Sequence, residues 1–258
     1  MTAVQTHGRR LLAVVLHLTA REFRIRYQSA LLGWLWALIP PVVRVAVLGA
    51  VFSILLPSQG PDYIAELAVG VLAWNWFASG VSSATSSAVD RSDLLSQPAL
   101  PRQAVPAVSV LTDAFDYLAG VPVLLVVVVL DTGRLPATAL LLPLLLVAQA
   151  FLMLGIGMAA SVADVRWRDT RLAVGLILGI SIYVTPVFYT GRALGERLQV
   201  LVTWNPMGVL IEAQRDVLVR GVLPNGPLVA TVSALCVAVL AVGWTVHRRS
   251  APTFLDHL

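Results

Sequence analysis

Lysine is missing from this sequence of 258 residues, so all 18 basic residues are arginines. Its absence excludes a Walker A phosphate loop, a Schiff-base mechanism and a lysine general base, because each of these needs a lysine amine. The chain therefore cannot be a P-loop ATPase.

Cysteine and histidine are also scarce. The one cysteine, Cys236, lies inside an apolar run, so neither an internal disulfide nor a cysteine-rich metal site can form, and we predict a small packing residue. The histidines lie near the chain ends without the spacing of metal ligands, at His7, His17, His247 and His257. We expect no catalytic residue, no metal and no cofactor in this chain itself.

Charged residues make up only 12% of the chain, against 58% hydrophobic residues, and the mean hydropathy is +0.83. Soluble domains have about 25% charged and about 45–50% apolar residues. So few charges cannot solvate a protein surface, whereas lipid suits the apolar remainder. The composition predicts an all-α membrane protein with one transmembrane domain. The arginines form no clustered polar face, which argues against nucleic acid as a partner.

Six apolar stretches are long enough, or nearly so, to cross about 30 Å of bilayer at about 1.5 Å per residue. They are 33–56, 63–83, 104–130, 137–163, 172–189 and 227–246. Pro40, Pro41 and Arg44 interrupt the first stretch. Inside the fourth, Gly155 and Gly157 predict close helix packing rather than a phosphate loop.

The distribution of arginine predicts the orientation. With the N-terminus in the cytoplasm, twelve arginines lie in inner connections and five in outer ones. Because positive loops favour the cytoplasmic side, we expect a multi-pass protein of a bacterial inner membrane with both termini inside.

Residues 9–28 are amphipathic. One helical face carries Leu12, Leu16, Thr19, Phe23 and Tyr27, and the opposite face carries Arg10, His17, Arg21, Arg24 and Gln28. This pattern predicts a helix in the inner membrane interface. Its contacts with lipid phosphates or a cytoplasmic partner are assigned to Arg21, Arg24, Arg26 and Tyr27. A basic anchor for the first span is a compatible interpretation.

The segment 190–226 is too polar to span a bilayer and too apolar for a free loop. Asn205 before Pro206 is typical of a helix start, with Asn as the N-cap and Pro at the first helical position. The charges that follow predict i,i+3 and i,i+4 pairs among Glu212, Arg215, Asp216 and Arg220. We expect one or two short helices at the outer face.

Asp113 and Asp116 are three residues apart and share one face of the third predicted span. A charge inside a bilayer costs about 2.5–3.5 kcal/mol, so both should face protein or water. Either they belong to a proton relay or substrate path, or Arg44 of the first span or hydroxyls of the second satisfy them. We favour the second interpretation, with Arg44, Asp113 and Asp116 as buried charges.

Short motifs occur in a fixed order along nearly the whole chain. They are 21–28 (REFRIRYQ), 32–40 (LGWLWALIP), 72–77 (LAWNWF), 164–169 (DVRWRD), 185–189 (TPVFY), 205–207 (NPM) with Ile211 and Glu212, and Thr253-Phe254 with Asp256. Through them the chain resembles the membrane subunits of type-2 ABC exporters, in the branch that exports O-antigens and teichoic acids. The loop 90–102 departs from the family pattern, since it lacks lysine and carries Pro98 and Pro101.

The resemblance implies a homodimer that docks two ATP-binding subunits, which would hold ATP and Mg²⁺, and exports a lipid-linked glycan or polyol-phosphate polymer between the two copies. The two inner connections would transmit motion from those subunits, although ordinary positive-inside loops would look similar. The coupling residues are then Arg91, Asp93, Leu94, Leu95, Pro101, Arg102, Asp164, Arg166, Arg168 and Asp169.

Aromatic residues near the ends of the predicted spans are candidates to line the substrate path, because sugars stack on aromatic faces. They are Trp34, Trp36, Tyr183, Phe188 and Tyr189. An aromatic belt at headgroup depth is the alternative, and we expect the belt for Trp74 and Trp76. Two other functions stay open: export of a small amphipathic drug by the same architecture, and proton-coupled transport through Asp113 and Asp116.

Overall fold

The computed structural model describes residues 2–27, 36, 38–55, 62–92, 101–189, 202–250 and 254, and these contain helices but no strand. The helices are α1 (Thr2–Tyr27), α2 (Ile39–Leu55), α3 (Tyr63–Asp90), α5 (Ala104–Thr132), η2 (Ala137–Leu141), α6 (Leu142–Arg166), α7 (Asp169–Val184), α9 (Pro206–Arg215), η4 (Asp216–Arg220) and α10 (Gly226–Ser250). η4 is a single π-helical turn that continues α9. Each of the six apolar stretches overlaps one α-helix, in the order α2, α3, α5, α6, α7 and α10.

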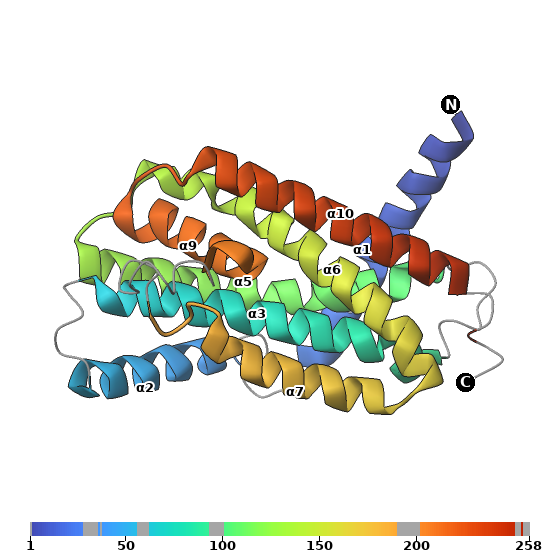
Figure 1. The fold of residues 1–258 in the computed structure, drawn as a ribbon, viewed down its shortest axis with the longest axis horizontal. Helices are drawn as coiled ribbons and strands as arrows, with labels where there is room; N and C mark the ends of the chain where they lie inside the picture. The colour runs from blue at the N-terminus through green and yellow to red at the C-terminus, as the bar shows by residue number, and fades with distance from the viewer. Residues whose placement is uncertain are drawn as a thin grey trace.

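Helix α3 is the centre of the bundle. It packs against α2, α5, α6, α7 and α9, and most of its side chains are buried. Asp131 of α5 caps its first turn, because one carboxylate oxygen accepts a hydrogen bond from the backbone N–H of Ala65 at 2.9 Å. Figure 1 shows α6 and α10 along one side of α3, with α2 and α7 along the other.

Helix α6 approaches both of its neighbours through glycines. A Cβ atom at Gly155 would lie 2.6 Å from the backbone of Val239 and Leu240 in α10, and one at Gly157 would overlap Ala84 of α3. Only small residues allow helices to come this close. The expected close packing at Gly155 and Gly157 is confirmed, and Cys236 is fully buried in the core, as predicted for a packing residue.

The bundle has two chemically different ends. The arginine-rich end, with Arg91, Arg166, Arg168, Arg248 and Arg249, contains the last turns of α3, α6 and α10 and the first turns of α5 and α7. The opposite end contains α9, η4 and the first turns of α3 and α10. In Figure 1, α1 leaves the bundle on the side of the arginine-rich end.

Phe254, beyond α10, is buried at the arginine-rich end. Its ring packs against Ala88 of α3, Val105 of α5 and Val165 of α6, and meets the ring of His247 edge-on at 5.2 Å. One side chain therefore joins the ends of four helices.

Four of the described helical segments are long and apolar enough to cross a membrane: Tyr63–Asp90, Ala104–Thr132, Ala137–Arg166 and Gly226–Ser250. Helices α2 and α7 are shorter, with 17 and 16 residues. Large apolar side chains such as Leu130, Leu140 and Leu144 are exposed on the outside of the bundle, as expected for a surface that faces lipid.

Candidate functional site

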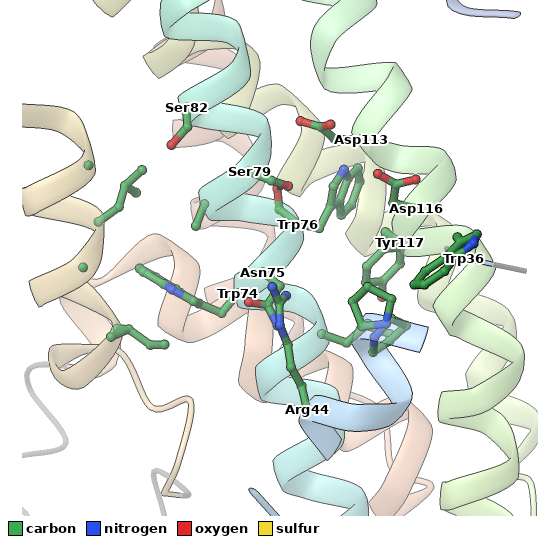
Figure 2. A pocket seen from close by; sticks show the side chains of 18 residues that line it. Trp36, Arg44, Trp74, Asn75, Trp76, Ser79, Ser82, Asp113, Asp116 and Tyr117 are labelled. Carbon is green, nitrogen blue, oxygen red and sulfur yellow. Dashed lines mark hydrogen bonds between the residues drawn. The ribbon is translucent and has the colours of Figure 1, made fainter. Parts of the chain in front are cut away.

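A groove of about 560 Å³ runs between α2, α3, α5 and α7 (Figure 2). Its polar lining consists of Arg44, Asn75, Ser79, Ser82, Asp113 and Asp116. Aromatic rings from Trp36, Trp74, Trp76 and Tyr117 complete much of the wall. A wall of mixed aromatic and polar groups is typical of a ligand site rather than of lipid-facing surface.

The polar side of the groove comes from the spacing of residues in α3. Asn75, Ser79 and Ser82 lie at positions i, i+4 and i+7, so they share one helical face, and both serines are exposed to the groove. The remaining faces of α3 are occupied by the buried core. The apolar character of the second predicted span therefore concealed a hydrophilic stripe.

The prediction that Trp74 and Trp76 belong to a lipid-facing aromatic belt is wrong. Both rings are buried: Trp74 packs on Phe77 at 5.3 Å between ring centroids, and Trp76 stacks on Tyr117 at 4.8 Å. Trp76 Nε1 and Tyr117 Oη are buried and have no hydrogen-bond partner among the described residues. Buried polar groups are normally satisfied, so these two atoms are exceptions within the wall of the groove.

Arg26 of α1, and not Arg44, is the partner of the two aspartates. Its guanidinium lies 2.6 Å from Asp116 Oδ2 and 3.4 Å from Asp113 Oδ1. The side chain of Asp113 is 7% exposed, that of Asp116 is half-buried, and Arg44 is exposed in the groove. Of the three charges expected to be buried, only Asp113 is. The predicted pairing with Arg44 is wrong, because Arg26 of α1 occupies the position beside both carboxylates.

The two candidate ion pairs can be separated by double-mutant cycles on thermal unfolding in detergent. We expect Arg26→Gln to lower stability by about 1–2 kcal/mol, because charge-assisted hydrogen bonds are lost but Arg26 is partly exposed. That loss should shrink when Asp116→Asn is already present. Arg44→Gln should show no such coupling; an equal coupling of Arg44 with Asp116 would contradict the observed geometry.

The other predicted path residues lie apart from the groove, except Trp36, which lines it. Tyr183 is 70% exposed on α7, and its ring approaches that of Phe188 at 6.1 Å. Tyr189 donates hydrogen bonds to the carbonyls of Tyr183 and Val184, so it closes the end of α7. Trp34 lies outside the described residues.

At the arginine-rich end, Arg171 joins the two connections that were assigned to coupling. It contacts Asp164 at the end of α6 at 2.9 Å and Asp90 at the end of α3 at 3.5 Å. Asp164 is fully buried, whereas Arg166, Arg168 and Asp169 are exposed. Arg91 binds Glu22 of α1 and Ser109 of α5, while Pro101 and Arg102 are half-buried; Asp93, Leu94 and Leu95 lie outside the described residues.

Helix α1 packs against α5, and its position in the membrane interface stays a prediction. Val15 and Thr19 are buried against Ala104 and Val108 of α5, whereas Leu16 is 55% exposed. Arg21 and Arg24 are exposed, and the side chain of Tyr27 is outside the described part. The apolar residues of α1 are thus divided between a protein-facing side and an uncovered side.

The opposite end holds an ionic network that sequence reasoning did not assign to any role. Arg215, 1% exposed, binds Glu212 at 2.7 Å and donates to the carbonyl oxygens of Glu66, Val187 and Tyr189. Burial lowers the pKa of Arg215 from its ordinary value, and the charge of Glu212 opposes this effect. Three main-chain contacts and one side-chain contact therefore depend on one guanidinium.

Arg220 completes the network, with its guanidinium within 3 Å of Glu66, Glu212 and Asp216. Burial acts to lower its pKa, but the hydrogen bond with Asp216 and the neighbouring carboxylates raise it overall. The i,i+3 and i,i+4 pairs are confirmed. The N-cap is confirmed as well, since Asn205 accepts from the backbone N–H groups of Met207 and Gly208.

Comparison with known proteins places this bundle in a family. The model of the family described as "ABC-2 type transporter" matches residues 13–219, which include all four walls of the groove. The chain belongs to the ABC-2 type transporter family.

Curated ABC-2 relatives match over nearly their whole length. An O-antigen export system permease protein RfbA of Klebsiella pneumoniae is 24% identical over 243 residues, 93% of each chain. The protein of that name from Myxococcus xanthus is 25% identical over 248 residues, 95% of each chain. The polysialic acid transport protein KpsM of Escherichia coli is 22% identical over 241 residues, 91% of this chain and 92% of the relative.

Proposed function

We propose that this chain is the permease subunit of an ABC exporter for a polysaccharide or a related hydroxyl-rich polymer, and that two copies set their grooves face to face to form the path. The relatives are named for O-antigen export and polysialic acid transport, and they align with this chain from end to end. A separate ATP-binding subunit supplies the energy, because the chain has no lysine and hence no Walker A site.

The observation that carries the proposal is the polar stripe of α3. Amide and hydroxyl groups of Asn75, Ser79 and Ser82 suit a polymer whose surface is mostly hydroxyl groups. Several weak hydrogen bonds, rather than one strong site, let such a chain be held and still slide.

A second copy is required to close the path. Among the described residues of α7 only Leu178 is buried, while Leu172, Leu176, Ile177 and Ile180 are exposed. Gly175 and Gly179 lie on the groove side of α7, and a Cβ atom added at either position would have no atom within 4 Å. A symmetric homodimer would cover this helix and turn the open groove into an enclosed passage.

We propose that the chain crosses the membrane six times, with the arginine-rich end in the cytoplasm of a bacterial cell. Helices α2 and α7 extend about 24–26 Å at about 1.5 Å per residue, close to the hydrocarbon thickness. The exposed Arg166, Trp167 and Arg168 then face the ATP-binding subunits, and α1 lies along the inner interface. Because Arg171 ties the ends of α3 and α6 together, a push on one connection reaches the other.

Making the stripe apolar should sharply reduce transport without unfolding the bundle. In cells that express this permease with its ATPase, we expect Ser79→Leu with Ser82→Leu to cut surface polymer about tenfold at unchanged membrane level, through lost hydrogen bonds and a narrower groove. The measurement is immunodetection of polymer on intact cells.

The control is Thr231→Leu with Thr245→Leu, on exposed positions of α10 where each hydroxyl bonds only the carbonyl four residues earlier. Equal export by both double variants would place the path elsewhere. If export persisted with a hydrolysis-deficient ATPase and stopped with an uncoupler, the proton gradient rather than ATP would drive it.

A further inference from the structure

We propose that Arg44 binds an anionic group of the transported molecule, so that the exported material carries phosphate or another acid group through the groove. This inference rests on the proposed function, since it assigns the substrate class of the same groove. Arg44 itself belongs to α2, and its side chain lies beside Asn75 in the view of Figure 2, with Asp113 and Asp116 further along the groove.

Arg44 has no counter-charge of its own. It lines the groove, it is exposed, and it forms no ion pair or hydrogen bond within the described part of the chain. A cation at the depth of a membrane span is costly and is normally paired or functional. The neighbouring Val42, Val43 and Val47 are exposed apolar residues typical of a span, so Arg44 is not at a polar helix end.

The carboxylates that could neutralise Arg44 are already engaged. Asp113 and Asp116 both contact Arg26, and Asp131 accepts from the backbone of α3. Glu66, Glu212 and Asp216 surround Arg220 at the opposite end. Asp113 and Asp116 are the carboxylates that line the groove, and in a second copy they would be held by the same arginine.

The surroundings of Arg44 fit an anion that passes rather than one that stays. A guanidinium presents paired N–H donors that match the oxygens of a phosphate or carboxylate. Asn75 contributes a side-chain amide on the same stretch of wall, and the groove there is open. Ser82 lies seven residues beyond Asn75 on α3, about 10 Å away along the axis, so Arg44 lies at one end of the polar stripe.

Two sources supply this chemistry: the phosphate or diphosphate of a lipid carrier, and acid groups within the polymer. The permease–ATPase complex in lipid nanodiscs separates them through tryptophan fluorescence, because Trp36, Trp74 and Trp76 line the groove. The probes are a polyprenyl diphosphate, an oligomer of polysialic acid and a neutral maltooligosaccharide. We expect at least one anionic probe to bind about tenfold tighter than the neutral one.

Arg44→Gln should remove that difference, Arg44→Lys should keep part of it, and Arg248→Gln, which deletes an exposed charge of α10, should keep all of it. If Arg44→Gln weakens binding of the diphosphate alone, Arg44 binds the lipid carrier. If it weakens binding of the sialic acid oligomer, Arg44 binds acid groups of the polymer. Equal binding of anionic and neutral probes, or unchanged binding by Arg44→Gln, overturns the role of Arg44 and leaves the proposed function intact. Failure of every glycan and lipid probe to bind the wild type overturns both.

Discussion

Arg215→Met is expected to cost about 3–5 kcal/mol of folding free energy, enough to remove most of the protein from the membrane. The guanidinium, itself 1% exposed, satisfies Glu212 and three backbone carbonyls. Methionine fills part of the volume but removes one donor from each carbonyl and leaves Glu212 with Arg220 but without Arg215. The measurement is the melting temperature of the detergent-solubilised protein, followed by size-exclusion chromatography.

Two variants make this result specific. Arg215→Lys keeps the charge but cannot reach all the acceptors with one ammonium, so we expect a loss nearly as large. Arg249→Gln, at an exposed position in the last turn of α10, should change stability by no more than about 0.5 kcal/mol. A melting temperature for Arg215→Met equal to that of Arg249→Gln would refute the assigned network.

Gly243→Val is expected to separate α10 from α6 and to prevent normal assembly. A Cβ atom at Gly243 would overlap the carbonyl oxygen of Gly155 and lie 2.8 Å from its carbonyl carbon. Backbone cannot move aside as a flexible side chain can, so the cost should exceed the typical ~1–3 kcal/mol of an overpacked core. We expect a large drop in membrane yield and a lower melting temperature.

The matched control lies on the same helix. Gly226 has no atom within 4 Å of a built Cβ position, so Gly226→Ala should be nearly neutral. Gly243→Ala should already be harmful, with Gly243→Val worse. If Gly243→Ala and Gly226→Ala behaved alike, the close approach of α6 and α10 would not exist in the membrane.

Much of the fold was predictable because it depends on local pattern. Apolar runs located the six helices of the bundle, and Asn205 before Pro206 located the start of α9 to the residue. The pairs inside α9 and η4 followed from helical spacing alone. Gly155 and Gly157 indicated close packing, since small residues in an apolar helix have few other uses.

The site was harder to predict because its contacts join segments far apart in the sequence. The sequence suggested Arg44 as the partner of Asp116, and only the course of α1 along α5 places Arg26 there instead. Tryptophan at the end of a span predicts a belt on statistical grounds, yet Trp76 meets Tyr117 from another helix. Arg215 gave a helical pair in the sequence, but its three carbonyl partners lie on α3 and beyond α7.

The position of Phe254 has a consequence for biosynthesis. Phe254 packs against Ala88, Val105 and Val165, which are translated well before Phe254 itself. Until α10 and the residues after it have been translated, this hydrophobic surface stays uncovered on a nascent chain that is already inserted in the membrane. A ribosome that stalls within α10 would thus leave an incomplete protein whose hydrophobic contact surface for Phe254 is exposed. Membrane quality-control proteases could recognise this surface, which the finished protein covers.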